Sequence, residues 1–299
     1  MNAIETRDLT KYYGDVRGVE DLSVTVETGE AFGFLGPNGA GKTTTIRTLL
    51  GLLSPTSGTA TVLGADVRDA DALREARARI GYLAAEPGLD ESATGRELVR
   101  LYGRLRGDTR SAELIELFDV PVERTVGDYS RGNRQKLAIV LSFMHEPDLV
   151  VMDEPTSGLD PLMQERFYAF LDEERERGVT LFLSSHVLGE VRRVCDRVGV
   201  IRDGRFVTVE SVADLLDRAG KRVSLRVAGA VEPDDFAFPG VHDLSVGETT
   251  TFTLAGSYDD LVDALDRYDI EDLEIEEAPL EEVFMRFYDD EAPAAEVAA

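Results

Sequence analysis

The sequence predicts an α/β fold in which helices cover a parallel sheet, followed by a smaller α/β module. Short apolar runs that are typical of buried parallel strands alternate with stretches of helical periodicity through residues 1–221. Residues 222–299 differ in charge, because 21 acidic residues against four arginines give them a net charge of −17. With 299 residues, 43% of them apolar, the chain is long enough for two domains with sizeable cores.

The predicted elements begin with a β-rich segment. Residues 4–35 contain β-rich runs separated by turn glycines, which indicates a β-subdomain leading into a core strand. In chain order we then expect strands over 22–26, 31–35 and 58–63, a helix over 71–79, a mainly helical stretch over 97–144, and buried strands over 149–152, 180–184 and 197–201, separated by helices. In the acidic module we expect strands over 223–227, 250–254 and 272–276, helices over 258–268 and 280–288, and a frayed end over 291–299.

The net charge argues against a nucleic-acid partner. At pH 7 the chain carries a formal charge of −26, and such a field repels nucleic acid and anionic lipid alike. Only four of the 32 basic residues are lysines, and this composition resembles that of proteins adapted to a salt-rich cytoplasm. Molar salt shortens the Debye length to about 3 Å and screens self-repulsion. We therefore expect a halophilic protein that is fragile when desalted, with an ordinary acidic mesophile protein as the alternative.

The single cysteine and the N-terminal residues indicate in which cellular compartment the protein works. Cys195 excludes an internal disulfide and a thiolate-rich metal site, and its helical surroundings (VRRVCDRV) favour a small buried residue. The first ten residues show no secretory signal. The longest apolar runs, such as 137–141, are far shorter than the roughly 20 residues that span a bilayer. We therefore expect a soluble intracellular chain whose membrane role comes from a partner.

A glycine-rich loop carries the strongest chemical signal. The segment GPNGAGKT, residues 36–43, has the spacing of a phosphate-binding loop and lies between a predicted strand and a predicted helix. Its backbone N–H groups are expected to wrap the β-phosphate of a nucleotide, Lys42 to reach the β- and γ-phosphates, and Thr43 to coordinate Mg²⁺. The residues expected to bind the nucleotide here are Gly36, Pro37, Asn38, Gly39, Ala40, Gly41, Lys42, Thr43 and Thr44.

Two carboxylates end a later apolar run, LVVMDE, at residues 149–154. The carboxyl end of such a strand is where an α/β sheet presents ligand-binding groups. Asp153 is expected to hold Mg²⁺, and Glu154 to polarise a water for attack on the γ-phosphate, as general base or water-orienting group. Such a pair alone would more often be a solvated strand end, but the phosphate loop favours the catalytic interpretation.

Together these residues resemble the nucleotide-binding subunits of ABC transporters, of the type that serves separate ABC-2-like permeases. Four further motifs resemble the family's signature loop in degenerate form, its D-loop, its switch-histidine segment and its adenine-contacting loop: YSRGNRQKL (129–137), SGLD (157–160), SSH (184–186) and LTKYYG (9–14). The motifs occur in the family's order. The ending APLEEVFMRFY (278–288) is also similar to the C-terminal end of ABC-2 type ATPases.

The resemblance implies a P-loop NTPase core of the RecA-like type with an antiparallel β-subdomain and an inserted helical subdomain at about 86–146. These parts would make up an ABC ATPase domain over 1–221. An acidic accessory α/β domain would follow over 222–290.

The resemblance also implies roles for residues outside the phosphate loop. Two subunits would bind head to tail around two ATP molecules, with Ser130 and Gly132 of one subunit contacting the γ-phosphate held by the other. His186 would bridge the γ-phosphate and Glu154, so that Lys42, Glu154 and His186 are the catalytic residues. Asp160 would couple the two sites across the interface.

The adenine-contacting loop contains two adjacent tyrosines, and two other segments depart from the family pattern. Tyr13, rather than Tyr12, is expected to stack on adenine, because adjacent strand residues face opposite sides. Ala85 stands where the family commonly has a glutamine that binds Mg²⁺ and senses the transporter. Either Glu86 partly substitutes for this glutamine, or the metal takes an extra water there. In the degenerate signature loop, Arg131 brings positive charge close to the phosphate. Both departures are compatible with slow basal ATPase activity.

Three functions fit these features. The first is an ATP-hydrolysing motor subunit that drives export by a separate permease, lies on the inner face of the membrane and touches the permease around residues 85–96. The second is a soluble ABC-type ATPase acting on ribosomes or DNA, which the single cassette and the acidic charge disfavour. The third is a regulatory nucleotide-binding module with little turnover, which Ala85 and the signature loop leave open. No motif specifies the cargo or the role of the acidic module.

Overall fold

The computed structural model describes residues 2–255 and 257–277. The chain divides into two compact units, Met1–Val209 and Glu210–Ala299. The expected helix over 280–288 and the expected frayed end lie outside the described residues. The limits given above for the ATPase domain, its helical subdomain and the accessory domain stay predictions.

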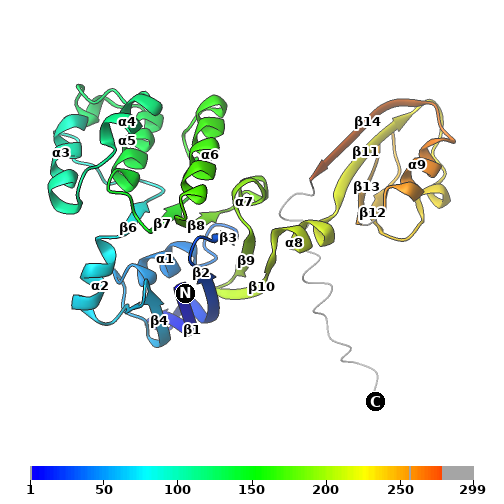
Figure 1. Cartoon of the computed structure of the whole chain (residues 1–299). Helices are drawn as coiled ribbons and strands as arrows, with labels where there is room; N and C mark the ends of the chain where they lie inside the picture. Colours follow the sequence, from blue (N-terminus) through cyan, green and yellow to red (C-terminus); the bar gives the residue numbers. More distant parts are fainter. Residues whose placement is uncertain (1, 256, 278–299) are drawn as a thin grey trace, which may run out of the picture. The chain divides into compact units, whose positions relative to one another are not determined.

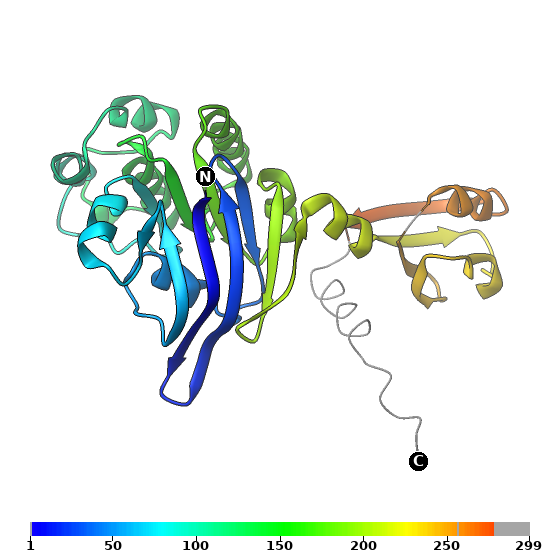
Figure 2. The same cartoon turned by 60° about the horizontal axis from the view of Figure 1, so that its bottom comes forward.

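The first unit is built on two sheets (Figures 1 and 2). Its strands are β1 (Asn2–Tyr13), β2 (Val16–Glu27), β3 (Ala31–Leu35), β4 (Ser57–Val62), β5 (Ala65–Asp66), β6 (Ile80–Leu83), β7 (Leu149–Asp153), β8 (Thr180–Ser185), β9 (Arg197–Arg202) and β10 (Arg205–Ser211), which runs on into the second unit. The four-stranded sheet β2-β1-β4-β5 is antiparallel. The six-stranded sheet has the order β10-β9-β3-β8-β7-β6, and its strands from β9 to β6 pair in parallel.

Helices and a shared core join these sheets. The helices are α1 (Lys42–Leu49), α2 (Ala70–Arg77), α3 (Gly95–Arg106), α4 (Ser111–Leu117), α5 (Arg131–Phe143), α6 (Pro161–Glu176) and α7 (Leu188–Val194), with a short 3-10 turn η1 (Val126–Asp128). One buried cluster contains Ile4 of β1, Phe32 of β3 and Ile46 of α1, so the phosphate-loop helix packs into the core of both sheets. Every residue of β3, β7 and β8 is buried, as expected of central parallel strands covered on both faces.

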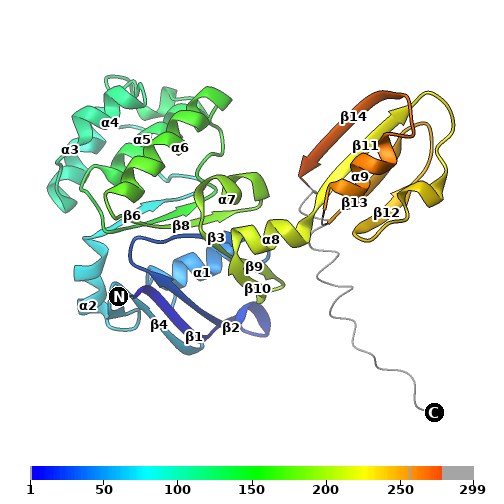
Figure 3. The same cartoon turned by 45° about the vertical axis from the view of Figure 1, so that its right-hand side comes forward.

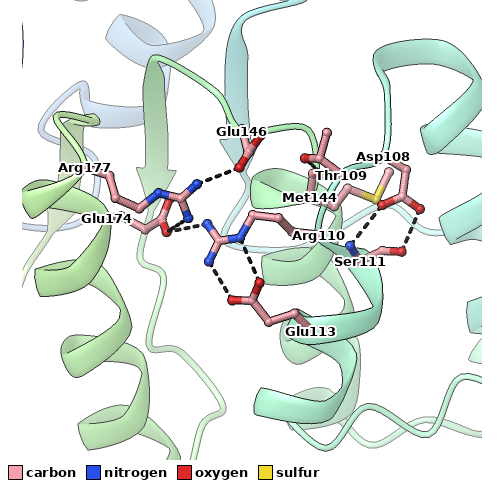
Figure 4. A network of polar contacts seen from close by, with 9 residues as sticks. All are labelled: Asp108, Thr109, Arg110, Ser111, Glu113, Met144, Glu146, Glu174 and Arg177. Carbon is pink, nitrogen blue, oxygen red and sulfur yellow. Dashed lines mark hydrogen bonds and ion pairs between the residues drawn. The ribbon is translucent and has the colours of Figure 1, made fainter.

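The helices α3, α4 and α5 gather at one end of this unit (Figure 1). Aromatic and charged contacts tie α5 and the two ends of α4 to α6. The ring of Phe170 in α6 lies 5.4 Å from that of Phe118 and 4.9 Å from that of Phe143, both edge to face. Beside these rings, Arg110 and Arg177 approach the carboxylate of Glu174 (Figure 4), with nitrogen to oxygen distances of 2.6 and 3.3 Å. The Glu174 side chain is 1% exposed, so this contact is a buried ion-pair network.

The second unit is a four-stranded antiparallel sheet with a helix against it (Figure 3). Its elements are α8 (Val212–Ala219), β11 (Lys221–Val227), η2 (Pro233–Phe236), β12 (Val241–Ser245), β13 (Thr250–Leu254), α9 (Asp259–Leu265) and β14 (Ile270–Glu277). The strand order is β12-β13-β11-β14. Val223 of β11, Phe252 of β13 and Leu261 of α9 belong to one buried cluster, so α9 and the sheet share a core.

The predicted fold class is confirmed, with corrections at single elements. The apolar runs at 31–35 and 149–152 coincide with β3 and β7. The acidic module has one strand more than expected, β12. The sequence did not predict this strand because it exposes most of its side chains and carries no apolar alternation. Cys195 is buried as expected but does not lie in a helix: α7 ends at Val194, and Cys195 has an extended backbone.

Candidate functional site

The phosphate loop connects β3 to α1 and is organised around Lys42. The Lys42 amine donates to the carbonyl of Gly36 at 2.6 Å and to that of Pro37 at 3.3 Å, and the side chain is almost fully buried. Gly41 has φ +109°, and a Cβ at that position would lie 2.6 Å from Val19 Cγ1. The loop therefore requires glycine there, and it holds the only lysine of the segment at the N-terminus of α1.

Thr43 and Asp153 meet across the end of the parallel sheet. The Thr43 hydroxyl donates to Asp153 Oδ2 at 3.0 Å, and the Ser184 hydroxyl of β8 donates to Asp153 Oδ1. Asp153 is 4% exposed. Burial, together with the charge of Asp153, raises the pKa of Tyr82 on β6 above its ordinary value.

These two oxygen donors fit Mg²⁺. A hydroxyl and a carboxylate are hard ligands, and Mg²⁺ in nucleotide sites commonly takes one or two protein ligands together with phosphate oxygens and waters. Within residues 2–255 and 257–277, no group of three or more His, Cys, Asp and Glu side chains is arranged to hold a metal ion. Thr43 and Asp153 are therefore candidates for a shared protein and phosphate site rather than for a closed protein cage.

Glu154 and His186 form the second pair of the site. His186 Nδ1 lies 2.7 Å from Glu154 Oε2, and Lys42 Nζ lies 3.3 Å from Glu154 Oε1. Since a carboxylate only accepts, the proton of the first contact belongs to the imidazole. Glu154 has φ +49°, an uncommon backbone conformation for a residue with a side chain, directly after β7. The turn at Glu154 brings its carboxylate between a lysine and a histidine.

Lys42, Thr43, Asp153 and Glu154 all line one cavity of about 430 Å³. It is lined by Tyr13, Val16, Arg17, Gly18, Pro37, Asn38, Gly39, Gly41, Lys42, Thr43, Thr44, Ala85, Asp153 and Glu154. Tyr13 is 47% exposed, and its hydroxyl lies 3.4 Å from that of Thr44. Tyr12 is not among the lining residues, so Tyr13 is the aromatic side chain in the wall of this cavity.

The structure places three predicted contacts away from this cavity. Ser130 caps α5, where its hydroxyl accepts from the Asn133 N–H at 3.2 Å, and Asp160 caps α6. Gly132 lies against the loop between β7 and α6, since a Cβ on Gly132 would be 2.8 Å from the carbonyl oxygen of Gly158. None of the three lines the cavity of its own chain.

The structure also shows where Ala85 lies, the residue that stands in place of the family's glutamine. Ala85 lines the cavity, so a methyl group stands in the wall at that point. Glu86 is exposed and is not among the lining residues. The arrangement therefore gives no support to Glu86 as a substitute ligand.

Two polar residues near the site were given no role from the sequence, although Ser184 belongs to the SSH motif. Ser184 bonds Asp153, and Glu190 in the first turn of α7 accepts from Thr156 and Ser185. Ser184 carries a detectable signal, because a serine that follows the apolar run 181–183 in a buried strand needs a polar partner. Glu190 carries none, since it is one of many acidic residues on predicted helices.

A phosphate-binding loop at the end of a parallel sheet, with two carboxylates where another strand of that sheet ends, defines a nucleotide-binding domain of the P-loop class. The family described as ABC transporter matches residues 19–157. The chain is 38% identical over 210 residues to the bacitracin transport ATP-binding protein of Bacillus licheniformis, which covers 68% of each chain. It is 34% identical over 297 residues to the Nod factor export ATP-binding protein I of Rhizobium johnstonii, which covers 95% of this chain and 94% of that protein. The chain belongs to the ATP-binding subunits of ABC transporters.

Solved structures agree with this assignment. The ATP-binding subunit of an ABC transporter superposes with a TM-score of 0.66 and 31% identity, covering 71% of this chain and 91% of that one. A dimeric ATP-binding cassette in a post-hydrolysis state, bound to ADP and phosphate, has a TM-score of 0.64 at 22% identity over 70% of this chain and 98% of that one, and so shows the fold alone. No helix among the described residues is long and apolar enough to cross a membrane.

Proposed function

We propose that the chain is the ATP-hydrolysing motor subunit of an ABC-2 type exporter that works with a separate membrane permease. The observation that carries the proposal is the position of Glu154 between Lys42 and His186, at 3.3 and 2.7 Å, in the cavity that also contains the phosphate loop. A carboxylate held in this way has the place and the charge to accept a proton from an attacking water. The relatives of this chain are named for the transport of bacitracin and the export of Nod factors.

The residues of the cavity divide the work of binding and hydrolysis. Tyr13 offers an exposed ring for stacking on adenine, and the loop from Gly36 to Thr44 supplies N–H groups for the phosphates. Thr43 and Asp153 would hold Mg²⁺, which supplies neutralising charge for the phosphate oxygens when it is bound. Lys42 reaches toward the same phosphates, and His186 keeps the Glu154 carboxylate oriented.

The dimer is the second part of the proposal. Ser130, Gly132 and Asp160 lie outside the cavity of their own chain, so we assign them to the nucleotide of a second subunit bound head to tail. ATP would then stabilise the closed dimer through contacts to the γ-phosphate, and hydrolysis would weaken it.

The permease contact is assigned to the segment around residues 85–96 and the groove beside it. A second cavity, of about 220 Å³, is lined by Tyr82, Ala84, Pro87, Gly88, Leu89, Tyr102, Arg106, Ala138, Leu141 and Ser142. Its wall includes Ala84 and Pro87, which flank Ala85 in the wall of the first cavity, so a partner in the groove would be close to the nucleotide. Binding there would place the subunit on the inner face of the cell membrane.

The hydrolytic part is tested with Glu154→Gln. Phosphate release over many turnovers is expected to fall by at least about 100-fold while ATP affinity is kept, because the isosteric amide cannot accept the proton. Glu165→Gln, an exposed residue of α6, is the matched control for the loss of one carboxylate. Equal turnover in wild type and Glu154→Gln would reject Glu154 as the catalytic base.

The transport part is tested by purifying the tagged chain from native membranes at high salt. A polytopic membrane protein recovered in fixed ratio is the expected result. Recovery of the chain alone, or together with ribosomes, would contradict the motor function and favour a soluble ATPase or a regulatory module.

A further inference from the structure

Glu190 joins the two backbone segments that carry the Glu154 and His186 pair. It lies in the first turn of α7, and each of its carboxylate oxygens accepts from a different hydroxyl. Oε1 accepts from Thr156, in the loop that follows β7, and Oε2 accepts from Ser185, the last residue of β8, at 2.6 Å. The side chain therefore bridges two segments 29 positions apart in the sequence.

The bridged residues are direct neighbours of the proposed catalytic pair. Thr156 comes two residues after Glu154, and Ser185 immediately precedes His186. The Ser185 hydroxyl also accepts from the Val187 N–H at 2.9 Å, so the backbone is held on both sides of His186. The orientation of His186 toward Glu154 thus depends on a hydroxyl that Glu190 fixes.

The backbone at Glu154 needs such support. Its φ of +49° is unfavourable for a residue with a Cβ, and a conformation of this kind persists only where the surroundings hold it. On one side, the Glu154 N–H donates to the Ser184 carbonyl at 2.9 Å. On the other side, the hydrogen bond from Thr156 to Glu190 fixes the chain after the turn.

We infer that Glu190 is a positioning residue that holds Glu154 and His186 in register for hydrolysis. The inference rests on the proposed ATPase function. Only a carboxylate offers acceptors to both hydroxyl donors at once, whereas glutamine has one acceptor oxygen and one NH₂ donor. Glu190→Gln keeps the shape and the helix, but it removes the charge and sets an NH₂ group against one hydroxyl, which must then accept instead of donate. Neither Thr156, Ser185 nor Glu190 lines the nucleotide cavity, so ATP binding is not touched directly.

The test measures phosphate release and ATP affinity separately in the full-length chain at high salt. Glu190→Gln is expected to lower turnover by roughly 10- to 100-fold, because small misplacements of catalytic groups are costly. The dissociation constant for ATP is expected to stay within about twofold. Glu173→Gln, an exposed residue of α6, removes the same charge and is expected to keep wild-type turnover.

A double variant separates positioning from general structural damage. In a His186→Ala background, Glu190→Gln is expected to cause little further loss, because the pair that it positions is already broken. Thr156→Val removes the opposite end of the bridge without changing shape, and it is expected to reproduce the loss of turnover. It replaces Glu190→Gln as the test if that variant folds poorly.

The inference is overturned if Glu190→Gln and Thr156→Val turn over like wild type, or if the loss adds in full to that of His186→Ala. Loss of ATP affinity in proportion to turnover would also overturn it. An active wild type with unaffected variants rejects the positioning role alone. An inactive wild type rejects the proposed ATPase function and this inference with it.

Discussion

The Thr43 hydroxyl donates to Asp153 Oδ2 at 3.0 Å, although 110 positions separate the two residues in the sequence. The contact exists because α1 begins at the end of β3, and β7 ends at the same edge of the parallel sheet, with β8 between the two strands. The parallel order brings the loop after one strand next to the last residue of the other. The two proposed Mg²⁺ ligands are therefore placed by the sheet and not by local sequence.

Removing the Asp153 carboxylate charge should weaken Mg²⁺ binding. We expect Asp153→Asn to raise the Mg²⁺ concentration for half-maximal ATPase activity by at least about tenfold, since an amide is a poorer ligand for a hard cation. Asp148→Asn, in the exposed ion pair just before the same strand, is the control and should leave the Mg²⁺ dependence unchanged. A Mg²⁺ titration that is identical for Asp153→Asn and wild type would contradict the assignment.

Loss of the Lys42 amine should weaken nucleotide binding. A charge-assisted contact to phosphate is lost in Lys42→Ala, so ATP affinity is expected to fall by roughly tenfold or more in equilibrium binding. Lys136→Ala, on α5 and outside the cavity, removes the same charge as a control. Unchanged ATP affinity in Lys42→Ala would reject its role at the phosphates.

The proposed dimer should form only with ATP and only with an intact signature loop. Glu154→Gln is expected to double in mass by light scattering when ATP is added, because the γ-phosphate is kept. Adding Gly132→Ala should abolish this change without loss of ATP binding, since the new Cβ would lie 2.8 Å from the Gly158 carbonyl oxygen and displace the loop. A dimer that forms equally well with ADP would contradict the mechanism.

The parallel sheet core was predictable, because both faces of its central strands are covered and they appear as continuous apolar runs. Residues 31–35 and 149–152 therefore predicted β3 and β7. Strand β12 (VHDLS) exposes most of its side chains, and no pattern marks it in the sequence. Lys42, Thr43 and Asp153 were accessible through motifs, whereas the bridge made by Glu190 depends on where β8 and the loop after β7 meet in space.

The buried network at Glu174 should contribute to stability more than any surface ion pair. Glu174→Ala leaves Arg110, whose side chain is 9% exposed, without its buried carboxylate partner, and is expected to lower the free energy of unfolding by about 3 kcal/mol. Asp172→Ala breaks the exposed pair with Arg193 and should cost less than about 1 kcal/mol. Urea unfolding at one fixed high KCl concentration measures both, and equal losses would contradict the argument.

Salt should stabilise the whole chain, because a formal charge of −26 opposes compaction in dilute buffer. The free energy of unfolding is expected to rise with KCl up to molar concentrations, where the Debye length falls to about 3 Å. Asp263→Asn with Glu274→Gln removes two exposed charges of the acidic module and should reduce the low-salt loss of stability. Thermal unfolding of both forms across a KCl series measures this. A stability that is independent of salt in both forms would favour an ordinary acidic mesophile protein, since its folded state would not need screening.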